Sequence, residues 1–251
     1  NNYENESETI YEYINFIIDE KFGFYSNEII NFPPVDDNWI SPEIINNSII
    51  EYSFMNYNIL NLLGQLDNLF TKFLEIRFLN YSLENEKELI EILDFCSNKI
   101  YRSIRFYFPF KENKTNSRII SLIDNFKKTD SLIFYNSPKQ EKIKQINSIY
   151  YIVNNIVDIT NRNFNKDLLI NNINFFQESQ KFNPYYNKKV CINEKGFAKN
   201  CLKNKMVFDN VNDVELKTII TKEEFQEFWN VNHDLIIEFK NDELRYNKLI
   251  T

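Results

Sequence analysis

Glycine is nearly absent from the sequence, with three residues in 251. Loops that cradle phosphate groups, and the tight turn that exposes an esterase serine, need glycines at fixed positions. None of these patterns occurs, which argues against such enzymes. Histidine is rarer still, with one residue, and the three cysteines add too little for a usual zinc centre of about four ligands. We therefore expect no metal and no cofactor.

Long apolar runs are also missing. The most apolar stretch, residues 52–66, is interrupted by asparagine and glutamine, so no segment reaches the roughly 18 apolar residues that span a bilayer. The net charge of −7 makes the surface repel a polyanion, and a nucleic-acid partner is expected only in the toxin alternative below. The 40 asparagines beside a single alanine are typical of an AT-rich genome and carry little functional information.

The first 180 positions do contain apolar residues at spacings of three and four, which is typical of helices with one buried stripe. Ser41 and Pro42 favour a helix start, and the spacing that follows predicts one long helix over 42–79. Further helices are predicted over 8–22, 84–107, 117–128, 138–161 and 165–181. No sequence repeat of 20 to 50 residues is visible. We therefore expect a mainly α fold, an elongated bundle of about six helices.

The pattern changes in the last quarter of the chain. Residues 214–218 alternate apolar and polar side chains, which predicts a strand. Residues 221–224 form a capping box that opens a short helix, and a turn-like sequence at 240–243 predicts a hairpin. The expected organisation is a helical bundle over 1–185 and a small strand, helix and hairpin unit over 186–251, packed on the bundle.

Two of the three cysteines, Cys191 and Cys201, flank Gly196 in the basic stretch KKVCINEKGFAKNC. They can meet if this loop folds back, and in an exported protein a disulfide explains their pairing better than two free thiols do. Such a bridge would hold several lysines outward, toward an acidic patch on a partner protein. These lysines are Lys188, Lys189, Lys195, Lys199 and Lys203.

The single histidine is the candidate for catalysis. His233 can act as a general base if Asp234 or Glu238 orients its ring and a loop lysine stabilises charge, as in small metal-free ribonuclease-like toxins. Lone histidines are commonly surface or hydrogen-bonded residues without a catalytic role. A toxin-like hydrolase or ribonuclease is therefore the alternative rather than the main interpretation.

Residues 102–111, RSIRFYFPFK, interleave cations with aromatic side chains. Stacking of bases between aromatic rings and cations is one way to bind a single-stranded nucleic acid. The negative net charge argues against that use, and aromatic residues at the end of a core helix commonly cap a bundle. We expect this stretch to belong to the core.

A non-enzymatic interaction protein that binds another protein is the function that these patterns favour. The chain begins with two asparagines and no methionine, which fits a mature secreted or exported chain or a piece of a longer one. A subunit of a cytoplasmic assembly is the alternative. Free thiols at Cys191 and Cys201 would favour that alternative.

Overall fold

The computed structural model describes most of the chain, namely residues 3–20, 39–111, 113–144, 148–161 and 169–249. These residues fall into two compact units, divided after residue 38. The first unit contributes helix α1, Tyr3–Asp19, which confirms the predicted amino-terminal helix although it begins earlier than residue 8. Apolar side chains of α1 such as Ile10 and Phe16 are exposed. All strands and the remaining helices belong to the second unit.

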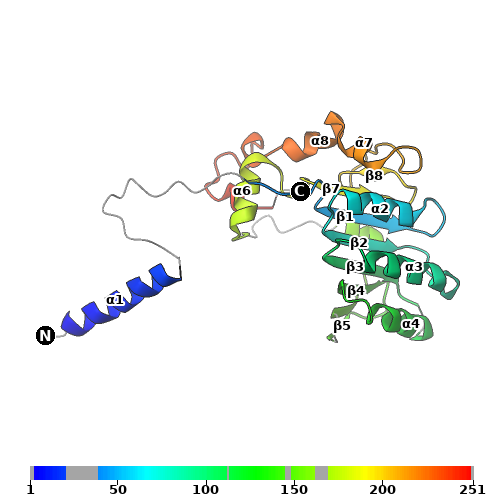
Figure 1. Cartoon of the computed structure of the whole chain (residues 1–251), viewed down its shortest axis with the longest axis horizontal. Helices are drawn as coiled ribbons and strands as arrows, with labels where there is room; N and C mark the ends of the chain where they lie inside the picture. The colour runs from blue at the N-terminus through cyan, green and yellow to red at the C-terminus, as the bar shows by residue number, and fades with distance from the viewer. Residues whose placement is uncertain (1–2, 21–38, 112, 145–147, 162–168, 250–251) are drawn as a thin grey trace. The chain divides into compact units, whose positions relative to one another are not determined.

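One eight-stranded mixed sheet forms the second unit (Figure 1). The strand order is β5-β6-β4-β3-β2-β1-β7-β8, and all neighbours are parallel except the outermost pairs, β5 with β6 and β7 with β8. The strands are β1 Asn47–Tyr52, β2 Phe73–Phe78, β3 Ser103–Pro109, β4 Thr129–Tyr135, β5 Glu141–Lys144, β6 Ser148–Tyr151, β7 Lys189–Ile192 and β8 Ala198–Lys199. With 38% helix and 20% strand this is an α/β fold, so the predicted mainly α helical bundle is wrong.

Strands and helices alternate regularly from β1 to β4. The intervening helices are α2 Ile59–Asn68, α3 Glu86–Ser97 and α4 Asn113–Ile123. The strands begin at residues 47, 73, 103 and 129, which gives a structural repeat of 26 to 30 residues. Because these strands follow chain order in the sheet and parallel crossovers are right-handed, all three helices lie on one side of it, as Figure 1 shows.

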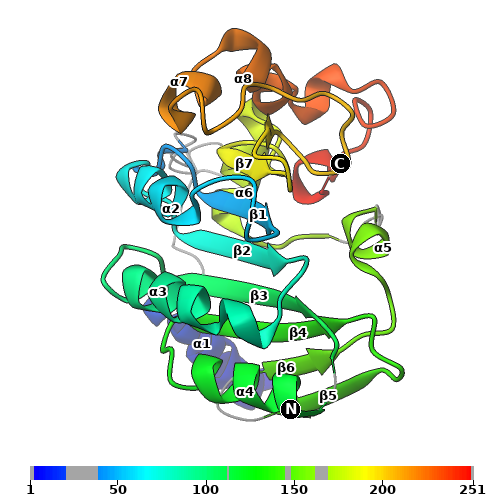
Figure 2. The ribbon, with the colours of Figure 1, turned by 90° about the vertical axis from the view of Figure 1, so that its right-hand side faces the viewer.

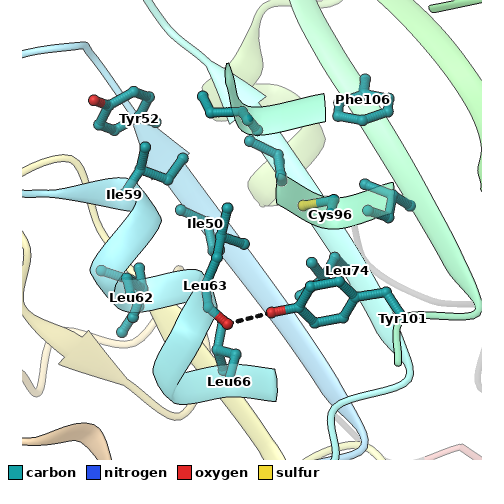
Figure 3. Close-up of a cluster of buried hydrophobic side chains, with 14 of the residues drawn as sticks. Ile50, Tyr52, Ile59, Leu62, Leu63, Leu66, Leu74, Cys96, Tyr101 and Phe106 are labelled. Carbon is teal, nitrogen blue, oxygen red and sulfur yellow. Dashed lines mark hydrogen bonds between the residues drawn. The ribbon is translucent and has the colours of Figure 1, made fainter. Parts of the chain in front are cut away.

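Alternate side chains of each strand fill the space between the sheet and these helices. Ile50, Ile76 and Phe106, from β1, β2 and β3, are fully buried, and Leu63 of α2 packs in the same cluster (Figure 3). The Tyr101 hydroxyl donates to the Leu63 carbonyl oxygen, so both polar groups are satisfied inside the core. One face of the sheet therefore provides most of the burial that stabilises the unit.

The predicted helix over 42–79 is in fact β1, α2 and β2 in succession. Asn58 begins α2 by accepting a hydrogen bond of 3.0 Å from the Asn61 backbone amide. Phe54 and Phe70, on either side of α2, have φ angles of 68° and 61°, so a regular helix cannot pass through either. Apolar residues of the two strands continue the three-and-four spacing of α2, which is why the stretch resembles one helix.

The carboxyl-terminal quarter shares the sheet with the rest of the unit. β7, from the segment 186–251 that was expected to form a separate unit, pairs in parallel with β1. Before β7, the predicted helix over 138–161 is β5, β6 and the short helix α5, Ile156–Thr160, while α6, Ile173–Lys181, occupies part of the predicted helix over 165–181. Among the described residues, no helix has the length and apolar content needed to cross a bilayer.

The elements after β8 differ in part from the prediction. Residues 214–218, predicted as a strand, lead into helix α7, Leu216–Ile220. The helix predicted after residue 221 is confirmed as α8, Glu223–Asn230. Turns and two short 3-10 segments replace the predicted hairpin. These segments are η2 His233–Leu235 and η3 Arg245–Asn247.

Burial under α2 gives a direct test of the fold. Leu63→Ala would leave a cavity in a fully buried site and is expected to lower the free energy of unfolding by about 2 to 5 kcal/mol. Leu83→Ala, at a residue whose exposed fraction is 39%, is the matched control and should change it by less than about 1 kcal/mol. Urea unfolding followed by circular dichroism measures both, and equal losses would contradict the packing described.

Candidate functional site

Along the strands, every second side chain is buried on the side of the repeat helices α2, α3 and α4. The side chains between them point to the opposite side of the sheet, which we call the second face. The second face carries Asn47, Ile49, Glu51, Phe73, Glu75, Arg77, Ser103, Arg105, Tyr107, Ser131, Ile133, Tyr135, Ser148, Tyr150, Lys189 and Cys191. Helix α5 packs on part of it, where Ile156 and Ile159 contact a cluster of Tyr107, Ile133 and Tyr135. Figure 2 shows the strands β2, β3, β4 and β6 that form the middle of the sheet, in this order. The repeat helices α2, α3 and α4 do not cover this face.

Five charged side chains of alternating sign run across the second face, from β1 to β4. The fifth, Asp130, reaches this face at a register shift, since Ile104 pairs with Thr129 but Arg105 pairs with Ser131. Arg77 Nη2 lies 2.6 Å from Glu75 Oε1, and Arg77 Nη1 lies 3.9 Å from Glu51 Oε1. Arg105 Nη2 lies 2.8 Å from Asp130 Oδ2, and Arg105 Nη1 lies 4.0 Å from Glu75 Oε2. Each charge in this row therefore has an opposite charge beside it.

Arg77 is the most buried member of the row, with an exposed fraction of 5%. Its Nη1 donates a hydrogen bond of 2.6 Å to Thr160 Oγ1 of α5, and its guanidinium carbon lies 5.4 Å from the centre of the Tyr107 ring. Burial acts to lower the pKa of Arg77, but the carboxylates of Glu75 and Glu51 outweigh it and raise that pKa. Arg77 therefore stays charged and holds α5 against β2.

Two hollows on the second face are both lined by Arg105 and Asp130, which we call the boundary pair. The first hollow, of about 470 Å³, is also lined by Asn47, Ser48, Ile49, Phe73, Leu74, Glu75, Ser103, Pro184, Tyr185, Lys189 and Leu249. The second, of about 700 Å³, is also lined by Tyr107, Ser131, Ile133, Gln140, Ser148, Tyr150, Ile152, Asn154, Asp158 and Ile159. Both volumes fall in the range of ligand pockets.

Hydrogen bonds hold the boundary pair in a fixed geometry. Asp130 Oδ2 accepts from Arg105 Nε at 3.2 Å, from Arg105 Nη2 at 2.8 Å and from Ser131 Oγ at 3.0 Å. Burial acts to raise the pKa of Asp130, but the hydrogen bonds from Arg105 and Ser131 outweigh it and lower that pKa. Burial likewise acts to lower the pKa of Arg105, and the hydrogen bond to Asp130 outweighs it. Both members therefore remain charged near neutral pH.

The predicted catalytic residues lie apart from these hollows. His233 is 1% exposed, its Nε2 lies 2.7 Å from the Lys248 carbonyl oxygen, and burial lowers its pKa. The carboxylate oxygens of Asp234 accept from Arg245 Nε at 2.7 Å and from the Tyr246 hydroxyl at 2.6 Å. The third candidate, Glu238, is exposed on a turn. None of the three lines either hollow.

The disulfide predicted between Cys191 and Cys201 is wrong, because both are free thiols. Cys191 lies fully buried in β7, where burial raises its pKa to about 12, and Cys201 Sγ lies 3.3 Å from the Tyr185 hydroxyl. The loop between β7 and β8 turns at Gly196, whose φ of 85° suits glycine. Strand pairing and this turn hold the loop, and neither secretion nor a toxin activity is supported.

Most of the predicted partner-binding lysines make contacts within the chain. Lys188 Nζ donates to two backbone carbonyl oxygens, at 2.9 and 2.6 Å, and Lys199 Nζ donates to the Leu202 carbonyl oxygen at 2.7 Å. The Nζ atoms of Lys189 and Lys203 lie 4.0 and 5.6 Å from the centre of the Tyr185 ring. The fifth, Lys195, is exposed, and Lys189 alone of the five lines a hollow. Their contact with an acidic partner stays a prediction.

The residues that dominate the second face are not among the candidates that the sequence alone suggests. Arg105 and Tyr107 belong to RSIRFYFPFK, a stretch expected at the end of a core helix, and they lie in strand β3 instead. A period of two in this stretch, with Ile104, Phe106 and Phe108 buried and Arg105 exposed, was the available signal. In the described ranges, no three His, Cys, Asp or Glu side chains are grouped to bind one metal ion.

Comparisons of the chain with protein-family models, with curated proteins and with solved structures found no match. The second face therefore has to be interpreted from its own geometry and chemistry.

Removal of the buried cation tests the role of the charged row. Arg77→Ala would leave Glu51 without its arginine and Glu75 with Arg105 alone, at 4.0 Å, and is expected to lower the free energy of unfolding by about 3 to 5 kcal/mol. Faster amide exchange in α5 should accompany this loss, since Thr160 would lose the hydrogen bond that ties α5 to β2. Arg118→Ala, which removes an exposed pair with Glu86, is the control and should change stability little.

The carboxyl group of Glu178, in α6, is expected to make the stability of the fold depend on pH. Burial raises its pKa to about 7, although Asn187 donates a hydrogen bond of 2.8 Å to its carboxylate. A folded-state pKa above the unfolded value stabilises the fold at low pH, and this stabilisation is lost as pH rises from about 4.5 to about 7.

Glu178→Gln removes this titration while keeping an oxygen that can accept from Asn187. The variant is expected to equal the wild type near pH 4 and to exceed its stability near pH 8 by up to about 3 kcal/mol. Urea unfolding across this pH range measures the difference. A stability difference that does not change with pH would contradict the assigned cause.

Proposed function

We propose that the chain is a non-enzymatic interaction protein that binds another protein through the second face of the sheet. The observation that carries this proposal is the pair of hollows, of about 470 and 700 Å³, that lie on one sheet face and are joined by the boundary pair. A contact area with two adjacent hollows on one sheet face is better suited to a protein surface than to a single small ligand.

The chemistry of the hollows supports a protein partner. Aromatic and aliphatic side chains form part of each lining, with Phe73, 40% exposed, in the first hollow and Tyr150 in the second. Polar groups and the charged boundary pair surround them. Aromatic residues and arginine are enriched at protein interfaces and supply most of the binding energy there. No histidine or cysteine lines either hollow, so the usual nucleophile and base pairs are not formed by the lining residues.

Lys189 links this proposal to the predicted role of the basic loop. It is the first residue of β7, lines the first hollow and lies against the Tyr185 ring. An acidic group of the partner beside the first hollow would meet its ammonium group. The loop thus contributes one cation at the margin of the binding face.

Affinity capture from extracts of the source cells tests the proposed function. The full chain should retain a partner protein, and Phe73→Asp and Tyr150→Asp should each reduce its recovery at least about tenfold, because a charge would enter an apolar contact. Quantitative mass spectrometry measures the recovery.

Met55→Asp is the matched control for this capture. Met55 is 85% exposed, lines neither hollow and accepts the same change from an apolar to an acidic side chain. Circular dichroism must show the three variants folded. Partner recovery that falls equally with all three variants, or with none, would contradict binding at the second face.

A further inference from the structure

The boundary pair has unused hydrogen-bonding capacity. All three hydrogen bonds to the Asp130 carboxylate end at Oδ2, and within the described ranges Oδ1 receives none. On Arg105, Nε and Nη2 make these bonds to Asp130, and Nη1 lies 4.0 Å from Glu75 Oε2. Asp130 Oδ1 can accept a further hydrogen bond and the remaining N–H groups of Arg105 can donate one, between the two hollows. A residue of an extended segment offers the complementary groups on one side, its own N–H and its own C=O.

The charged row leaves no strong net charge for a partner to neutralise. Its two arginines stand between three carboxylates, and each arginine has at least one carboxylate within 3 Å. Recognition at this site therefore depends on apolar side chains and on backbone groups more than on charge. Ile49, Phe73 and Leu249 supply apolar surface in the first hollow, and the second is lined by Tyr107, Ile133 and Ile152.

Strand geometry gives the distance between the hollows. The first rests on side chains of β1, β2 and β3, and the second on side chains of β3, β4 and β6. Their centres are thus about two strand spacings of 4.8 Å apart across the sheet, and about two or three residues apart along the strands. The separation is roughly 13 Å, which an extended chain covers in about three to five residues.

From these contacts, and on the basis of the proposed function, we infer that the partner contributes an extended segment. It places two bulky apolar side chains, about three to five residues apart, in the two hollows, and it presents the backbone N–H and C=O of one residue to the boundary pair. Arg105 donates to the carbonyl oxygen of that residue, and Asp130 accepts from its N–H group.

Selection from a phage-displayed library of random dodecapeptides on the full chain tests this inference. Enriched sequences are expected to share two bulky apolar residues with about the stated spacing. Synthetic peptides of these sequences are then measured by fluorescence anisotropy. Replacement of either apolar residue by alanine should weaken binding about tenfold.

Double-mutant cycles assign each apolar residue to its hollow. Phe73→Ala should couple to one of the two peptide positions and Tyr150→Ala to the other. Arg105→Lys keeps a cation beside Asp130 but removes the second nitrogen donor, and it should weaken all selected peptides by a similar factor of about ten. This uniform loss separates backbone recognition from side-chain recognition.

The outcomes distinguish this inference from the proposed function. A library without enrichment, peptides with one apolar anchor, or affinities unchanged by Arg105→Lys would overturn the extended segment. Binding at the second face would still stand in each case if partner capture depends on Phe73 and Tyr150. Partner recovery that neither Phe73→Asp nor Tyr150→Asp reduces would overturn the proposed function itself.

Discussion

Burial of one side of a parallel sheet under three successive helices is the constraint on which the rest of this structure depends. Once Ile76 must face α2 and α3, its neighbours Glu75 and Arg77 must face the other way, because strand side chains alternate. Pairing in register repeats this choice on each strand and brings Arg105 beside Glu75. The charged row is therefore a consequence of how the apolar core is arranged.

Alternation also explains why the row has to be balanced. Arg77 is nearly inaccessible once α5 packs over Tyr107 and Ile133, and a buried cation is stable only with carboxylates beside it. Glu75, shared between Arg77 and Arg105, joins the buried end of the row to the exposed boundary pair. The interaction that secures α5 and the one that shapes the two hollows are thus parts of one network.

Local sequence predicted the helices near α4 and α8, where apolar residues recur at helical spacing. The strands were not predicted, because their apolar residues fit the helical spacing of three and four as well as the strand period of two. Residues 42–79 have the helical spacing, yet two of their segments are strands that pair with each other. The site was less predictable still. Arg105 and Asp130 are 25 positions apart, and only the parallel pairing of β3 with β4 makes them neighbours. Nothing in either local segment encodes that pairing.

Rare residues directed attention away from the second face. In a chain with one histidine and three cysteines these residues stand out, yet His233 and all three cysteines are buried. The second face uses instead the tyrosine, phenylalanine and isoleucine that the composition supplies in abundance. Its specificity then arises from register, since a one-residue shift of β3 would bury Arg105 and turn Phe106 outward.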